Sequence, residues 1–234
     1  VANAKNGTIH RIDGRTAPRL TAAGVVNAAS FAGGIVPGSL TTIFAAGLRD
    51  DAGSIVAPQV PLPTSLDGVS ITVANIAAPI YSVSNVNGQE QVTFLAPAEL
   101  AGRSTASVVI TRNGQESASA DVPVLATQPG VYTVDGTQAV AVHNAGYSLV
   151  TSSNPLTPGE FAFLYVSGLG SSTDVRVTLA GVSCPVQYAG LAPGFPGVYQ
   201  VNFQVPAVAD GSQSLVVSAS GVSSPSVQVS VTRK

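Results

Sequence analysis

Four sequence blocks occur twice in this chain, in the same order. The first begins at Pro37-Gly38 and again at Pro158-Gly159. The other three pair residues 73–80 with 179–186, 92–98 with 201–207, and 108–110 with 215–217. Four collinear matches indicate an internal duplication, so the chain is expected to build one structural unit twice.

Each copy contains short apolar, β-branched runs separated by Gly, Pro, Asn and Asp, a pattern typical of strands. The runs are residues 69–73, 91–95, 106–111, 161–166, 175–179, 199–205, 215–220 and 227–231. Asn113-Gly114 and Asp135-Gly136 lie between such runs and predict hairpins with type I′ turns, whose central residues have positive φ. The sequence therefore predicts an all-β protein.

The length of each copy, about 105 residues with about seven strands, is typical of an immunoglobulin-like sandwich. The Cys-Trp-Cys core of antibody domains is absent, because the chain has one Cys and no Trp. We predict two tandem immunoglobulin-like β-sandwich domains, at residues 21–126 and 127–234, preceded by an extended N-terminal arm at 1–20. The first copy carries a Pro-containing insertion between Leu48 and Asp67.

The composition excludes several classes of protein. Only 9% of the residues are charged, against about 25% in typical soluble domains, and the net charge of -2 gives no broad basic face for nucleic acid. The longest apolar runs, such as residues 76–80, are far shorter than the roughly 20 residues of a transmembrane helix. We expect a folded protein with no nucleic-acid partner and no transmembrane segment.

The chain has no Met and begins at Val1. Removal of a secretory signal peptide would explain a chain that starts at Val1 without Met, and trimming of a longer chain is the alternative explanation. We expect a secreted, extracellular protein at the cell surface.

Several motifs resemble a known family. They are Val25-Val26-Asn27-Ala28-Ala29-Ser30-Phe31, Ile35-Val36-Pro37-Gly38-Ser39, Leu191-Ala192-Pro193 with Gly194-Phe195, and Tyr199-Gln200-Val201-Asn202-Phe203-Gln204-Val205-Pro206. Together they resemble the duplicated, Ig-like or TIG-like domain at the C-termini of many large secreted proteins of acidobacteria and their relatives. The resemblance covers roughly residues 22–234 and implies an extracellular tandem of largely unassigned function.

Residues for catalysis are few. His10 lies in the arm, His143 precedes a turn, and Cys184 occupies the position of Ala78 in the other copy, which indicates a small buried side chain. No nucleophile elbow, zinc-binding helix, Cys-x-x-Cys pair or P-loop occurs. We predict a non-enzymatic protein without a cofactor.

Two loops carry weaker binding signals. Asp50 and Asp51 form the only adjacent acidic pair and could help to bind calcium, although a metal site needs six to eight oxygens and a simple turn fits equally well. Phe195, with Tyr199 close behind it, could form a ligand loop for glycans. Packing of Phe195 at the end of the sandwich is the alternative.

The arm differs in charge from the rest of the chain. It holds four basic residues and one acid, a net +3, whereas residues 21–234 hold six basic and eleven acidic residues, a net -5. An arm that adds as a strand to a neighbouring subunit produces an open filament. Its candidate contact residues are Ile9, Arg11, Ile12, Arg15, Arg19 and Leu20.

Three hypotheses follow. The first is a structural subunit that self-assembles head-to-tail, through the arm, into a pilus-like filament or surface layer. The second is a monomeric adhesin or carbohydrate-binding module whose partners are surface glycans, with the insertion and the Phe195 loop as its contact surfaces. The third is an accessory domain pair of a larger secreted protein.

Overall fold

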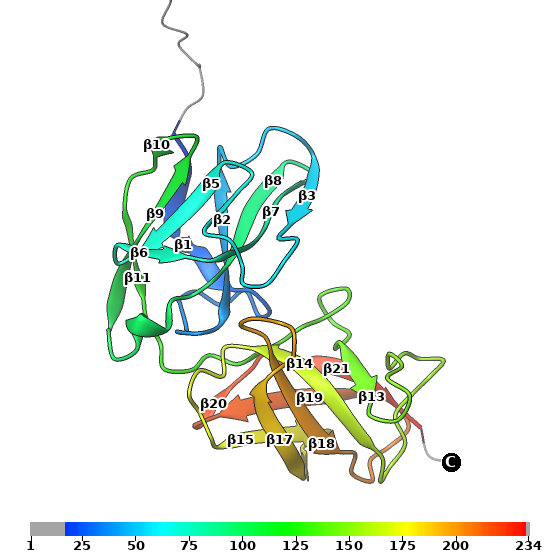
Figure 1. Cartoon of the computed structure of the whole chain (residues 1–234). Coiled ribbons are helices and arrows are strands. Elements are labelled where there is room, and N and C mark those ends of the chain that lie inside the picture. Colours follow the sequence, from blue (N-terminus) through cyan, green and yellow to red (C-terminus); the bar gives the residue numbers. More distant parts are fainter. Residues whose placement is uncertain (1–16, 233–234) are drawn as a thin grey trace, which may run out of the picture.

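The computed structural model describes residues 17–232, which fold almost entirely into antiparallel strands (Figure 1). The first sheet of the first domain has the order β1 (Arg19–Asn27), β2 (Leu40–Ala46), β8 (Gln89–Leu95), β7 (Ile80–Val86) and β3 (Gly53–Val56). The second sheet has β10 (Gln115–Glu116), β9 (Thr105–Arg112), β5 (Val69–Val73) and β4 (Ser65–Leu66), with β11 (Ala120–Pro123) on β9 and β6 (Ile76–Ala78) on β5. A 3-10 turn, η1 (Ala98–Leu100), precedes β9.

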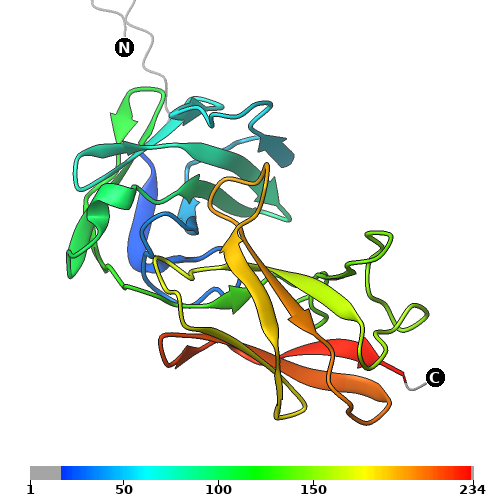
Figure 2. The same cartoon turned by 60° about the horizontal axis from the view of Figure 1, so that its bottom comes forward.

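The second domain repeats this two-layer arrangement. One sheet contains β12 (Gly130–Val131), β14 (Phe161–Ser167), β18 (Tyr199–Gln204) and β17 (Val186–Leu191), with β13 (Ala141–His143) on β14. The other contains β16 (Val182–Cys184), β15 (Val175–Leu179), β19 (Gly211–Ala219) and β20 (Val222–Ser223), with β21 (Val227–Val231) on β19. Figures 1 and 2 both show the two domains as separate bodies that meet along one side.

The two copies pair their strands in the same register. Ile43 lies opposite Val92 in the first domain, and Leu164, which matches Ile43 in sequence, lies opposite Val201 in the second. Because side chains alternate between the two faces of a strand, conserving the register keeps the same positions in the core. The duplicated sequence therefore produces a duplicated sheet.

Each domain has its own hydrophobic core between its two sheets. The first core includes Ile43, Phe94 and Ile110, and the second includes Leu164, Phe203 and Val217, all of them fully or almost fully buried. These residues alternate with side chains that point away from the core, as the period-two pattern requires. The predicted fold class, all-β with two immunoglobulin-like sandwiches, is confirmed, and residues 1–16 of the predicted arm lie outside the described residues.

The two predicted hairpin turns differ. Asn113 and Gly114 both have positive φ, at 49° and 82°, as a type I′ turn requires. In the other turn only Gly136 has positive φ. Asp135 instead accepts hydrogen bonds through Oδ1 from the backbone N–H of Thr137 (2.9 Å) and Gln138 (2.7 Å), an Asx turn that closes a longer loop. The type I′ prediction was wrong there because the Asp side chain binds the backbone itself.

Between residues 17 and 232, no helix has the length and apolar character needed to cross a membrane.

Candidate functional site

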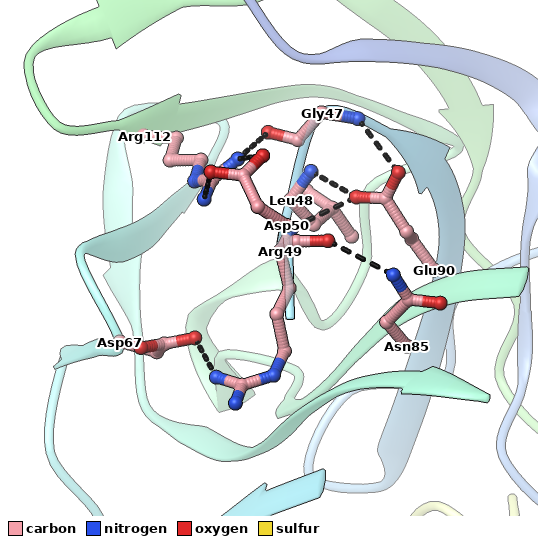
Figure 3. Close-up of polar contacts among 8 residues, drawn as sticks. All are labelled: Gly47, Leu48, Arg49, Asp50, Asp67, Asn85, Glu90 and Arg112. Atoms are coloured by element: carbon pink, nitrogen blue, oxygen red, sulfur yellow. Dashed lines mark hydrogen bonds and ion pairs between the residues drawn. The ribbon is translucent and has the colours of Figure 1, made fainter. Parts of the chain in front are cut away.

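The acidic pair Asp50 and Asp51 lies at the start of the insertion in the first domain, and Figure 3 shows Asp50 with its partners. Both carboxylate oxygens of Asp50 accept hydrogen bonds from the Arg112 guanidinium, at 3.2 and 2.9 Å. Asp51 is exposed. Within residues 17–232, no group of three or more His, Cys, Asp or Glu side chains gathers as a metal site. The structure therefore places Asp50 in an ion pair that anchors a loop.

The same region contains a second anchor. The Glu90 carboxylate accepts hydrogen bonds from the backbone N–H groups of Gly47 (3.3 Å), Leu48 (2.5 Å) and Arg49 (2.8 Å). Arg49 also forms an ion pair with Asp67 at the far end of the insertion (Figure 3). Charged acceptors make strong hydrogen bonds to backbone N–H groups. These contacts fix both ends of the insertion to the sandwich.

His143 and Cys184 take structural positions, and His10 lies outside the described residues. His143 is buried at the end of β13, with Nδ1 3.2 Å from Glu160 Oε1 and Nε2 3.2 Å from the Asn154 carbonyl oxygen. Cys184 is buried in the second core, as Ala78 is in the first. Burial raises the pKa of the Cys184 thiol to about 11, so at neutral pH it is a protonated, unreactive side chain.

The proposed contact residues of the arm divide into two groups. Ile9, Arg11, Ile12 and Arg15 lie outside the described residues. Arg19 and Leu20 begin β1 and lie opposite Ala46 and Ala45 of β2 in the same chain.

The two residues of the candidate ligand loop point in different directions. Phe195 is 48% exposed and lies in the loop between β17 and β18, which reaches from the second domain to the first (Figure 2). Tyr199 is 7% exposed and belongs to the second core. Of the two, only Phe195 has an exposed side chain.

Phe195 lies at the edge of a groove of about 330 Å³ between the domains, here called the interdomain groove. The chain has six tyrosines and seven phenylalanines, and five of these residues line the groove: Phe31, Tyr81, Tyr132, Tyr165 and Phe195. The other lining residues are Ala28, Leu40, Thr42, Ser82, Gln91, Thr93, Val140 and Val198. None of these residues is charged. Apolar grooves of this size with a few polar groups are typical ligand sites.

The floor of the interdomain groove is the outward face of the first sheet. Thr42 on β2 and Thr93 on β8 point away from the core, are buried under the second domain, and hydrogen-bond to each other at 2.9 Å. Gln91, two residues before Thr93, points the same way and is half-buried. Period-two alternation thus supplies polar groups to the groove and apolar groups to the core.

A β-bulge places Tyr81 in the groove. Ile80 lies opposite Phe94 and Ser82 opposite Thr93, so one residue of β7, Tyr81, has no residue opposite it. A bulge lets two consecutive side chains point to the same face, and Tyr81 and Ser82 both line the groove. The second domain has the same irregularity between Val186 and Tyr188, at Gln187.

Aromatic rings continue from the groove along β14. The centroids of Phe195 and Tyr165 lie 5.8 Å apart, those of Tyr165 and Phe163 5.6 Å, and those of Phe163 and Tyr147 6.3 Å. Phe163 and Tyr165 face away from the core, which receives Ala162 and Leu164 instead. Burial raises the pKa of Tyr132, which also lines the groove, to about 12, so its hydroxyl keeps its proton well into the alkaline range.

The linker between the domains is fixed by hydrogen bonds on both sides. Asn27 Nδ2 donates to the carbonyl oxygen of Gln128 (2.8 Å), and Gln128 Nε2 donates to that of Gly33 (2.9 Å). The backbone N–H of Gln128 and the Thr127 hydroxyl both donate to the Gly168 carbonyl oxygen, at 2.8 and 3.0 Å. The linker therefore contacts both domains at once.

The domains also contact each other directly. The backbone N–H of Leu40 donates to the Gly197 carbonyl oxygen (3.2 Å), and the Ser167 hydroxyl donates to that of Leu40 (3.1 Å). A Cβ added to Gly168 would lie 2.0 Å from the Gln128 carbonyl oxygen, and one added to Gly197 would lie 2.6 Å from Leu95. The absence of a side chain at these two glycines lets the linker and the two domains approach each other closely.

Sequence reasoning missed the groove, although one signal for it was present. Residues 161–166, Phe-Ala-Phe-Leu-Tyr-Val, are apolar at every position, and such runs are typical of strands buried on both faces. In a two-layer sandwich, the second buried face needs something outside the domain to cover it. Here the first domain and the Phe195 loop lie next to that face.

No family model and no curated protein matches this chain. Among solved structures, the Bacteroides ovatus mixed-linkage glucan utilization locus protein SGBP-B, in complex with a mixed-linkage heptasaccharide, matches with a TM-score of 0.34 and 11% identity. That match covers 85% of this chain, which spans 43% of the other. Domains 5–6 of the S-layer protein SbsC match with a TM-score of 0.28, 13% identity and coverages of 86% and 93%. The I9–I11 tandem from titin matches with a TM-score of 0.26 and 8% identity, and the match covers 93% of this chain and 66% of the titin tandem. With TM-scores this low, none of these structures informs the function of the chain.

Proposed function

We propose that this protein is a non-enzymatic, extracellular recognition module that binds surface glycans between its two immunoglobulin-like domains. The observation that carries the proposal is the interdomain groove, to which both domains contribute aromatic side chains. Exposed aromatic rings beside free polar groups provide both stacking and hydrogen bonding, and aromatic side chains are enriched where proteins bind their partners.

The fixed joint supports this proposal. A groove whose walls are already held by hydrogen bonds loses little conformational entropy when a ligand enters, and this preorganisation increases affinity. The walls here are held through Asn27, Gln128 and Leu40. The two domains therefore act as one binding unit.

The test is binding of the full chain to an array of immobilised glycans and glycoproteins. We expect Phe195→Ala to weaken binding at least about tenfold, since truncating a central aromatic residue at an interface commonly costs more than 1 kcal/mol. Val134→Ala is the control, because Val134 is 63% exposed in the same domain and lines no part of the groove. Equal binding by the wild type and Phe195→Ala would refute the proposal.

A second candidate function is self-assembly into a filament or surface layer through the N-terminal arm. The observation that favours it is an open sheet edge: β3 ends the first sheet and is exposed at three of its four residues. Such an edge accepts an added strand, and the arm's net charge is opposite to that of the rest of the chain.

Negative-stain microscopy of the full chain and of a chain lacking residues 1–16 tests this second function. The deletion stops at residue 16 because Arg19 and Leu20 already belong to β1. Filaments formed only by the full chain are the expected result. Single particles of the full chain at high concentration would contradict it.

A further inference from the structure

Phe195 also lines a second hollow. It has a volume of about 210 Å³ and is lined by Val60, Leu191, Ala192, Gly194, Phe195 and Pro196; we call it the Val60 hollow. Val60 comes from the insertion of the first domain, and the remaining residues come from the β17–β18 region of the second. Because Phe195 lines both cavities, the interdomain groove and the Val60 hollow are neighbours that share this side chain.

The two cavities carry no charge. Neither the residues of the interdomain groove nor those of the Val60 hollow include Asp, Glu, Lys or Arg. An ionised ligand would lose part of its hydration there without gaining a counter-charge, which is unfavourable. The lining thus selects against phosphate, sulfate, carboxylate and ammonium groups.

The polar groups of the groove suit a ligand with many hydroxyls. The Gln91 amide and the Ser82 hydroxyl line the groove and are half-buried, and within residues 17–232 neither side chain makes a hydrogen bond. An amide both donates and accepts, as a hydroxyl does. The Gln91 amide and the Ser82 hydroxyl can therefore both donate hydrogen bonds to ligand hydroxyls and accept hydrogen bonds from them.

The aromatic rings suit the faces of pyranose sugars. An aromatic face is electron-rich, and the axial C–H groups of a pyranose form a flat, weakly positive face of similar size. A sugar chain repeats this face at intervals, with its hydroxyls directed to the sides. Phe31, Tyr165 and Phe195 present rings to the interdomain groove, and Leu191, which is 57% exposed, lines the Val60 hollow with Phe195.

We propose that the ligand is a neutral, linear polysaccharide, bound by an internal segment that passes from the interdomain groove over Phe195 into the Val60 hollow. This inference rests on the proposed function. It adds that the ligand is uncharged, that it is linear, and that it extends from the interdomain groove into the Val60 hollow.

The ligand class is tested with the full chain by affinity electrophoresis and calorimetry. The panel has neutral linear polysaccharides (glucans, mannans and unsubstituted xylan), acidic ones (alginate, polygalacturonate and heparin) and a proline-rich peptide. We expect binding to at least one neutral polymer and to none of the others. Binding only to an acidic polymer or to the peptide, if lost in Phe195→Ala, would overturn the inference and leave the site assignment standing. Binding unchanged in Phe195→Ala would overturn both, and no binding to any panel member would overturn the inference.

The path across Phe195 is tested by Leu191→Asp, which places a charge in the Val60 hollow at an exposed position. We expect this variant to bind the polymer at least about tenfold more weakly, while a disaccharide of the same sugar, which occupies only the interdomain groove, binds as in the wild type. Val222→Asp is the matched control, because Val222 is 42% exposed on β20 and lines neither cavity. Equal polymer binding by Leu191→Asp and the control would show that the ligand does not reach the Val60 hollow.

Discussion

Phe31 shows how one residue serves the groove at a cost to the fold. It ends the turn after β1 with φ 57° and is 57% exposed. For an L-residue, this left-handed conformation costs roughly 1–2 kcal/mol. The conformation places the ring at the interdomain groove, beside Phe44 at a centroid distance of 5.9 Å.

We predict that Phe31→Gly is more stable than Phe31→Ala by about 1 kcal/mol. Both substitutions remove the ring, but glycine adopts positive φ without the steric clash that the Cβ of alanine makes with the backbone. Chemical denaturation of the two variants measures the difference in the free energy of unfolding. If the two unfolding curves coincide, the backbone at position 31 is not strained. Both variants should bind the polysaccharide less tightly than the wild type.

Cys184 gives a prediction about pH. Burial raises its pKa from 9.0 to about 11, so the unfolded chain loses the thiol proton at lower pH than the folded chain does. This contribution to stability is complete below pH 9 and is lost as the pH rises from 9 to about 11. Iodoacetamide at pH 8 should label the native protein slowly and the denatured protein quickly.

The alanine variant provides the control for this prediction. Cys184→Ala should fold normally, because Ala78 fills the same position in the first domain, and its stability should decline less between pH 9 and 11. Rapid labelling of the native wild type would show that the thiol is accessible.

At the scale of elements, the insertion in the first domain is held by charges that the second domain lacks. Glu90 binds three consecutive backbone N–H groups at the start of the insertion, and Tyr199 stands at its position in the second copy. The anchored insertion carries Val60 to the hollow beside Phe195. The anchor therefore shapes part of the proposed ligand surface.

We predict that Glu90→Gln lowers the free energy of unfolding by roughly 1–3 kcal/mol, the range for losing charged hydrogen bonds to backbone groups. Hydrogen exchange at residues 47–51 should become faster, while exchange in β14 and β18 stays unchanged. Glu116→Gln on the exposed strand β10 is the control. An unchanged exchange rate at residues 47–51 would mean that Glu90 does not hold the loop.

At the scale of the whole molecule, hydrogen bonds at the joint between the domains hold the two sandwiches on either side of the interdomain groove. The joint leaves no room for a side chain at Gly168, where φ is 80° and an added Cβ would lie 2.0 Å from the Gln128 carbonyl oxygen. Widening this joint would separate Phe31 and Tyr81 of the first domain from Tyr165 and Phe195 of the second.

We predict that Gly168→Ala changes the angle between the domains and weakens polysaccharide binding at least about tenfold, with both domains still folded. Gly181→Ala is the matched control, because Gly181 has φ 77° but nothing within 4 Å of an added Cβ. Positive φ destabilises alanine to a similar extent at both positions. A difference in binding or in domain arrangement between the two variants therefore reports on the joint. Small-angle scattering reports the domain arrangement. Identical scattering and binding by the two variants would contradict a rigid joint.

Local patterns in the sequence were sufficient to predict the fold. Period-two alternation determines which side chains enter a core, and the repeated blocks align Ile43 with Leu164 and Val92 with Val201, the pairs that the sheets bring together. The Asn113-Gly114 turn was also predictable, because positive φ at both positions favours those residues. These features depend on neighbours close in the chain or on the strand period.

Only the tertiary structure creates the interdomain groove. The groove combines Phe31, Tyr81 and Tyr165, which come from a turn, a bulge and a strand of two different domains. The angle between the domains depends on contacts such as Asn27 with Gln128 and on the absence of a side chain at Gly168, and no repeating pattern encodes these contacts. The sequence by itself determined two sandwiches and their cores, because side-chain alternation is a local property. The groove between them arises from long-range packing, which alternation does not specify.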